Sequence, residues 1–376
     1  MNNSLIVSAL AMLALTSCNG KDDTQTAQGG LTIIDVDNPV VTDNPPIGDL
    51  IDTAFVVQFK GDDLLMQGAY NVQKSADRII VSDPRTQEPI KFFDANGNFI
   101  RSLRSGNGPG EIDNIGDMFF DAKRQVLFVS NSQFWSIFDK DGNFKEQIQL
   151  PFQYGNMTRL GDEYVFWLFD YQRNDSIGTQ LFVTDTAFCV THKYFPMEDS
   201  KVPFVIVTDY IARSDDHVSV TRDTIYYYAD SQLTPRYYYK YSERFDKNNF
   251  ISVSSSEDFE RIPGYMQSFI ENSKTAVMKL AKFDNKNYKY AITDKKSGKS
   301  YVYSYYREGT GDESDLPVFF KSSWTGDDYF IIPTYDGIFD QLSDFKPFMS
   351  EADRKIIDNF QLDDNPILVF FRFKEF

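Results

Sequence analysis

The sequence is poor in the residues on which metal binding and nucleophilic catalysis most often depend. Its 376 residues include only two histidines and two cysteines. Neither His192 nor His217 has a cysteine or histidine at zinc-ligand spacing, and neither lies beside a G-x-S-x-G elbow. Cys18 and Cys189 are too few for a disulfide framework. The sequence therefore predicts no metal and no cofactor, and linear spacing identifies no catalytic residue.

Positive charge is also scarce. The chain has 38 Lys and Arg against 55 Asp and Glu, which gives a formal net charge of −17. Binding to nucleic acid depends on cations that displace the counterions of phosphates, and binding to anionic lipid depends on basic patches. We therefore expect no nucleic-acid partner, and we interpret the acidic surface as a source of solubility.

The apolar run at the N-terminus, from Leu5 to Leu15, is too short to span a bilayer and suits the core of a signal peptide. It ends in Leu15-Thr16-Ser17-Cys18, which resembles the lipobox of bacterial lipoproteins. The resemblance implies that residues 1–17 are a lipoprotein signal peptide and that Cys18 carries lipid after cleavage. The sequence departs from the usual pattern in having no Lys or Arg before Cys18. The alternative is an ordinary signal peptide with a chance cysteine.

The segment after the lipobox is polar and rich in small residues, so we expect residues 18–30 to form a flexible tether. Within it, Lys21-Asp22-Asp23 is similar to the surface-export signals of some Gram-negative lipoproteins. This similarity implies an outer-membrane lipoprotein that is held to the membrane by its lipid and displayed on the cell surface. The alternative is the same anchor with the protein facing the periplasm.

The most informative stretch, Ile79 to Phe152, contains one pattern twice. In each copy a β-type run, Ile79–Asp83 or Leu127–Asn131, is followed by a hairpin pattern that begins at Phe93 or Phe138. These two phenylalanines are 45 residues apart. Alternating apolar residues rich in Val, Ile and Phe favour strands, and a spacing of about 40–50 residues with several short strands is typical of a β-propeller blade.

The residues at the turns of the repeat predict the type of each hairpin. Asn96-Gly97 and Asp141-Gly142 each separate two strand-like runs, so we expect two-residue type I′ hairpins. The third copy, at Asp185-Thr186-Ala187, has no glycine, and we expect a different turn type there. A calcium loop would need its glycine at the sixth position and a glutamate at the twelfth, which the sequence does not provide. Hairpin turns are the better interpretation.

The run from Phe93-Asp94 to Gly110-Glu111 combines a D-x-x-G-x-F hairpin with a G-x-G-P-G-E loop. This combination resembles the six-bladed β-propeller lipoproteins of Gram-negative anaerobes, which are relatives of NHL-repeat propellers. The resemblance implies an all-β fold of six four-stranded antiparallel blades and a location in the cell envelope. The loop itself is interpreted as a tight crossing between two blades.

The propeller is expected to cover residues 31–376, with short helical insertions near 263–282 and 337–360. The first rests on apolar residues spaced as in a helix through Tyr265–Lys282. Blade six lacks a strand in consecutive sequence, so we predict that Ala54–Lys60 pairs antiparallel with Pro366–Phe373 and closes the ring. Cys189 is expected to be a buried thiol.

Two classes of function remain open from the sequence. The favoured one is a non-catalytic envelope lipoprotein that binds a glycan or an envelope protein. The alternative is a hydrolase or lyase acting on sugars or lactones, with carboxylates that converge at the central channel from different blades. Trp135, Trp167 and Trp324 are candidates for stacking on sugar rings, although packing between blades would also use them.

Overall fold

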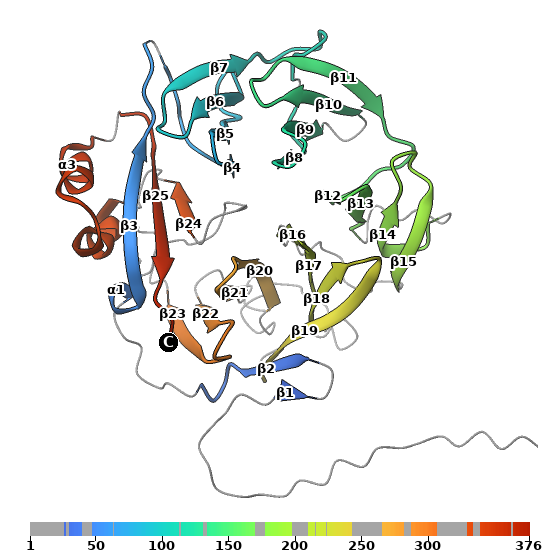
Figure 1. Cartoon of the computed structure of the whole chain (residues 1–376), viewed down its shortest axis with the longest axis vertical. Coiled ribbons are helices and arrows are strands. Elements are labelled where there is room, and N and C mark those ends of the chain that lie inside the picture. The colour runs from blue at the N-terminus through green and yellow to red at the C-terminus, as the bar shows by residue number, and fades with distance from the viewer. Residues whose placement is uncertain are drawn as a thin grey trace, which may run out of the picture.

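The computed structural model is a ring of six antiparallel β-sheets arranged around a central axis (Figure 1). The propeller predicted from the sequence repeat is confirmed, and so are the six blades that the family resemblance implied. The structure describes residues 26–27, 30–39, 47–62, 64–112, 114–130, 134–169, 177–197, 210–214, 216–222, 224–242, 265–281, 287–306, 329–333, 339–361 and 364–376.

The first three blades follow the chain in order, each from the innermost strand outward. Blade one contains β4 (Asn71–Lys74), β5 (Arg78–Ser82), β6 (Ile90–Asp94) and β7 (Phe99–Leu103). Blade two contains β8 (Asp117–Asp121), β9 (Val126–Ser130), β10 (Phe134–Asp139) and β11 (Phe144–Gln149). Blade three contains β12 (Asn156–Leu160), β13 (Glu163–Trp167), β14 (Thr179–Thr184) and β15 (Val190–Pro196).

Of the other three blades, blade five is again consecutive in sequence, whereas blades four and six also contain strands from the N-terminal part of the chain. Blade four contains β16 (Ile211–Arg213), β17 (Val218–Thr221), β18 (Thr224–Ala229) and β19 (Gln232–Lys240), extended by β2 (Leu31–Asp35) and β1 (Thr26–Ala27). Blade five contains β20 (Tyr265–Glu271), β21 (Thr275–Ala281), β22 (Asn287–Asp294) and β23 (Ser300–Tyr306). The described strands of blade six are β24 (Phe330–Pro333), β25 (Ile367–Phe373) and β3 (Ile51–Gln58).

The apolar core is divided among the six seams between neighbouring blades. The seam between blades one and two, for example, packs Phe92 of β6 against Phe120 of β8 and Phe138 of β10. Five further clusters fill the other five seams. Because each sheet is covered on both faces, its middle strands, such as β9 and β25, are apolar on both faces, and the large aromatic content of the sequence supplies the volume.

The predicted closure of the ring is confirmed. β25 pairs antiparallel with β3, with Leu368 opposite Val57 and Phe370 opposite Phe55. On its other side β25 pairs with β24, so β25 is the middle strand and β3 the outer strand of this sheet. The N-terminal part of the propeller thus completes the last blade.

The prediction of a helix through Tyr265–Lys282 is wrong. This segment is the hairpin of β20 and β21. Phe269 and Ile270 are adjacent in sequence and both buried, Phe269 in the seam with blade four and Ile270 in the seam with blade six. Burial on both faces removed the two-residue alternation, so the apolar spacing imitated a helix.

The helical decoration predicted near residues 337–360 is confirmed within the described residues. It consists of η3 (Phe339–Phe348), a 3-10 helix, and α3 (Glu351–Asn359). Both pack on the outside of blade six, where Asp353 accepts a hydrogen bond from the backbone N–H of Val56 in β3 (3.3 Å). A further short helix, α1 (Ile47–Leu50), precedes β3. No helix within the described residues is long and apolar enough to cross a membrane.

The hairpin turns differ from the type I′ prediction. Gly97 and Gly142 have positive φ values of 81° and 77°, whereas Asn96 and Asp141 do not. Each turn is therefore a type I turn followed by a glycine bulge. The third copy has the same geometry, because Phe188 adopts a φ of 60° at the glycine position. Our expectation of a different turn at Asp185 was wrong.

The prediction for Cys189 also fails, because its side chain is exposed. Cys189 follows Phe188, and its backbone N–H donates to the carboxylate of Asp185 (2.9 Å). Cys189 thus lies at the tip of the hairpin. The apolar run Phe188-Cys189-Val190 had suggested that it lies inside a buried strand.

Candidate binding groove

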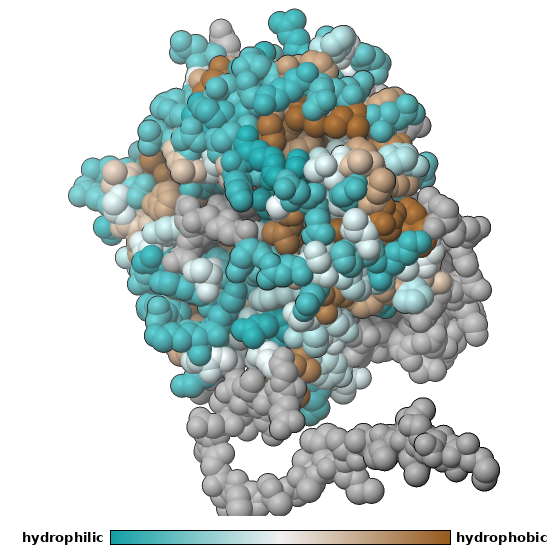
Figure 2. Space-filling model, turned by 45° about the vertical axis from the view of Figure 1, so that its right-hand side comes forward, coloured by the Kyte–Doolittle hydropathy of each residue, from teal (hydrophilic) through white to brown (hydrophobic). Residues whose placement is uncertain are grey.

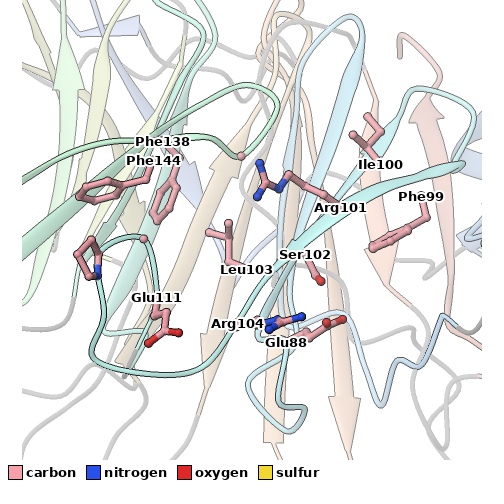
Figure 3. Close-up of a pocket in the computed structure, with 13 residues that line it drawn as sticks. Glu88, Phe99, Ile100, Arg101, Ser102, Leu103, Arg104, Glu111, Phe138 and Phe144 are labelled. Atoms are coloured by element: carbon pink, nitrogen blue, oxygen red, sulfur yellow. The ribbon is translucent and has the colours of Figure 1, made fainter.

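A groove of about 570 Å³ lies on the outer rim of the ring, where blade one meets blade two (Figure 3). One wall is the outermost strand of blade one, β7, and the other is formed by the loop after it and the start of β11. The lining residues are Glu88, Phe99, Ile100, Arg101, Ser102, Leu103, Arg104, Pro109, Gly110, Glu111, Phe138, Gly142 and Phe144. The sequence had suggested the mouth of the central channel, so the described groove lies elsewhere.

Both motifs that carried the family resemblance, the D-x-x-G-x-F hairpin and the G-x-G-P-G-E loop, contribute to this groove. The end of the G-x-G-P-G-E loop lines one wall, and the D-x-x-G-x-F hairpin of blade two brings Phe144 to the same wall. Gly110 has a φ of 82°, and a side-chain carbon there would lie 3.0 Å from Cβ of Phe144. The carboxylate of Glu111 accepts a hydrogen bond from the N–H of Gly108 (2.8 Å). This confirms the prediction of a tight loop between two blades.

The groove combines apolar and charged groups at the surface. Ile100 is 39% exposed and Phe144 38%, although Phe144 also contacts Phe138 edge-on. Arg101 donates to the side chain of Asn143 across the seam (2.7 Å), and Arg104 is exposed at the far end. Elsewhere the face of the molecule shown in Figure 2 is mainly hydrophilic, with apolar side chains in small separate patches. The exposed apolar side chains of the groove can make van der Waals contacts with a ligand, and its charged side chains can form hydrogen bonds with it.

The predicted sugar-stacking residues do not contribute to this groove. Trp135 is fully buried, and its ring N–H donates to the hydroxyl of Tyr154 (2.6 Å). Trp167 is 2% exposed and stacks on Tyr210, with ring centroids 4.5 Å apart. Both pack seams between blades, so neither offers a face to a sugar ring. The other predicted site residues, Trp324, Cys18, Lys21, Asp22 and Asp23, lie outside the described residues.

Polar side chains near the axis connect the inner strands of adjacent blades. The side-chain oxygen of Gln73 in β4 accepts a hydrogen bond from the backbone N–H of Phe120 in β8 (3.2 Å). Asp117 of β8 accepts one from Met157 in β12 (3.2 Å). These contacts hold the first three blades together at the centre of the ring.

A buried ionic cluster that the sequence analysis did not predict lies at the seam between blades four and five. Glu271, at the end of β20, is 5% exposed. Its carboxylate accepts hydrogen bonds from four side chains: His217 (2.9 Å), Ser219 (2.5 Å), Tyr227 and Lys295 (2.8 Å). Because Glu271 lay in the segment assigned to a helix, its proximity to blade four could not be anticipated.

This glutamate is held in its charged form. Burial alone would raise its pKa, but the hydrogen bond from His217 and the charge of Lys295 outweigh that effect and lower the pKa to about 2. The other ring nitrogen of His217 lies 2.7 Å from the carboxylate of Asp216. The His217 ring therefore contacts two carboxylates, one at each nitrogen. Glu271 is surrounded by hydrogen-bond donors and is unsuited to exchange a proton near neutral pH. We interpret the cluster as structural.

The aspartates of the hairpin turns likewise form hydrogen bonds within the protein. Asp94 and Asp139 each accept backbone hydrogen bonds from residues two and four positions later, at 2.9 Å. These bonds stabilise the turns, as the hairpin interpretation requires. Within the described residues, no group of three or more His, Cys, Asp or Glu side chains is placed to hold a metal ion.

The ring of blades defines the class of the protein, a six-bladed β-propeller. The chain belongs to a family described as a domain of unknown function, DUF4934, whose model matches residues 31–372. No curated protein sequence matches the chain.

Among solved structures, an exported protein of Bacteroides fragilis is similar in fold. It has 17% sequence identity and a TM-score of 0.68, over 91% of this chain and 100% of that one. BamB of Moraxella catarrhalis has 11% identity and a TM-score of 0.37, over 66% and 67% of the two chains. A quinonprotein alcohol dehydrogenase-like protein of Bacteroides thetaiotaomicron has 10% identity and a TM-score of 0.35, over 66% and 70%.

Proposed function

We propose that this protein is a non-catalytic lipoprotein of the cell envelope that binds a glycan or an envelope protein through the groove between blades one and two. The observation that carries the proposal is the groove itself. The hairpin and loop motifs meet there, and Phe144 and Ile100 are exposed beside charged side chains. Export is supported by the description of the similar Bacteroides fragilis protein as exported.

The position of the N-terminal strands supports the same proposal. β2 pairs with β19 of blade four, and Ile34 of β2 and the following Val36 pack into the seam with blade five. In a ring of six blades this seam lies opposite the seam between blades one and two (Figure 1). Cys18 precedes β1 by eight residues, which span at most about 28 Å. A lipid on Cys18 would therefore keep blades four and five near the membrane and direct the groove away from it.

The enzymatic alternative would need carboxylates that are free to exchange protons. At the seam between blades four and five, Glu271 is surrounded by donors. In the central region Asp117 binds a backbone N–H of the next blade. These contacts favour binding over hydrolysis or lyase chemistry.

The groove can be tested with Phe144→Ala. Ligands selected by the wild-type protein from a glycan array and a random peptide library are expected to bind this variant at least about tenfold more weakly, because an exposed aromatic contact is lost. Val190→Ala is the matched control, since Val190 also begins an outermost strand and is 39% exposed. Equal affinity of Phe144→Ala and wild type for every selected ligand would contradict the proposal.

Membrane attachment is tested with Cys18→Ala. The wild-type protein is expected to incorporate labelled lipid and to sediment with outer membranes, whereas the variant should lose both properties. If Lys21-Asp22-Asp23 directs the protein to the cell surface, protease added to intact cells will digest the wild type. A variant that still sediments with membranes would contradict lipidation, and digestion only after lysis would indicate the periplasmic orientation.

A further inference from the structure

The outer edge of β7 lines the groove and, unlike the outer edges of blades four and six, is not covered along its length by another described strand or helix. β7 is the last strand of the sheet β4-β5-β6-β7, so its second edge faces the groove. In blade four the corresponding edge, that of β19, is covered by β2. In blade six the outer strand β3 is covered by η3 and α3. Exposed strand edges are templates for pairing with another chain.

Two segments of the chain already pair with this edge, one at each end. Near its start, the N–H of Lys60 donates to the carbonyl of Gly97 (2.9 Å), and the N–H of Phe99 donates to the carbonyl of Lys60 (2.7 Å). Beyond its end, the N–H of Ile112 donates to the carbonyl of Arg104 (2.9 Å). Both bridges are parallel. The edge is thus paired at both ends, and the stretch between them lines the groove.

Ser102 lies in the middle of the stretch of β7 between the two bridges (Figure 3). The backbone N–H and C=O groups of successive residues in a strand point to opposite edges, so residues two apart share an edge. The N–H and C=O groups of Ser102 therefore point the same way as the carbonyl of Arg104, away from β6. The two bridges, at Asn98 and Ser105, are seven residues apart, or about 23 Å at 3.3 Å per residue. This distance leaves room for an extended segment of about four residues.

We propose that the groove receives an extended segment of a protein partner, which runs parallel to β7 and adds a strand to blade one. This inference rests on the proposed function of the groove and narrows its ligand to a peptide. β2 provides the precedent, because it pairs in parallel with the outer strand of blade four from Thr32 to Asp35. Alternate side chains of the segment would contact Phe144 and Ile100, and an acidic one would meet Arg104.

The test uses a phage-displayed library of random dodecapeptides selected on the lipidated full-length protein in detergent. A selected peptide is expected to bind Ser102→Pro at least about tenfold more weakly than wild type, because proline removes the outward N–H and its ring blocks pairing. Ser102→Ala keeps that N–H, so it measures the effect of losing the side chain alone, and Ser102→Pro should bind at least about tenfold more weakly than this variant as well. A thermal melt establishes whether Ser102→Pro is folded, since proline is tolerated on an open strand edge.

A second measurement does not depend on any variant. Bound peptide should slow hydrogen exchange in residues 99–104 of the wild-type protein by at least about tenfold. The proposal is overturned if peptide binds Ser102→Pro as tightly as wild type, if exchange in this segment is unchanged, or if the library yields no binder. If the groove instead binds a glycan that Phe144→Ala weakens, the strand proposal fails while the proposed function stands.

Discussion

Replacing Glu271 by alanine is expected to lower the free energy of unfolding by about 3–5 kcal/mol, because removing one partner of a buried ion pair leaves the other charge uncompensated. Lys295 would keep a charge that is 17% exposed, and the hydroxyls of Ser219 and Tyr227 would lose their acceptor. The cluster connects β17 and β18 of blade four to β20 of blade five, so the loss should weaken the seam that joins two blades. Urea unfolding of the variant and wild type measures the difference.

The same carboxylate predicts a dependence on pH. Its pKa is lowered from the ordinary value of 4.5 to about 2 in the folded protein. A group with a lowered folded pKa contributes stability that is complete above its ordinary pKa and is lost as the pH falls through the folded pKa. The difference in unfolding free energy between wild type and Glu271→Ala should therefore shrink as the pH falls from about 5 to about 2.

Glu375→Ala is the matched control, because Glu375 pairs with Lys274 and Lys296 in the same region but is 53% exposed. Exposed ion pairs contribute about 0–1 kcal/mol, so this variant should unfold almost as the wild type does. Replacing Glu271 and Lys295 together by Gln and Met should cost less than Glu271→Ala, because no charge is left unpaired. If Glu271→Ala unfolds as wild type does at pH 7, the cluster does not stabilise the seam.

Deleting residues 366–376 is expected to leave the protein insoluble. Six of the seven side chains of β25 are buried, and they fill the seams of blade six with both blade five and blade one. The deletion would also leave β3 and β24 without their shared partner. The total stability of a domain is about 5–15 kcal/mol, and losing the middle strand of a blade that closes the ring is expected to exceed it.

The solubility of the deletion variant after expression measures this effect. A shorter deletion of residues 374–376 provides the control, since it leaves β25 intact. That variant loses contacts of Phe376 with Tyr301 and Asp294, and its melting temperature should fall by only a few degrees. A protein that ends at Asn365, stays soluble and melts like the full chain would show that the ring does not depend on β25.

The repeat of 45 residues was sufficient to predict propeller blades, because the strands of a blade follow one another in sequence, apart from those that the N-terminal part of the chain adds to blades four and six. Closure by Ala54–Lys60 could be predicted as well, since one blade lacked a strand and one alternating run was unassigned. The helix prediction failed at β20 and β21 because burial on both faces removes the alternation that marks a strand. The turn prediction failed at Asp185 because Phe188 adopts the conformation that glycine usually supplies.

The sequence by itself determined that the chain forms propeller blades, because strand-forming residues and turns recur within short distances along the chain, and the family resemblance implied that there are six of them. Only the tertiary structure brought Glu271 to His217, 54 residues away, and placed Phe144 beside Gly110 and Arg104 in one groove. Only the structure also showed that Trp135 and Trp167 are buried. Such contacts depend on how one blade packs on the next, and the residues involved have no regular spacing in the sequence.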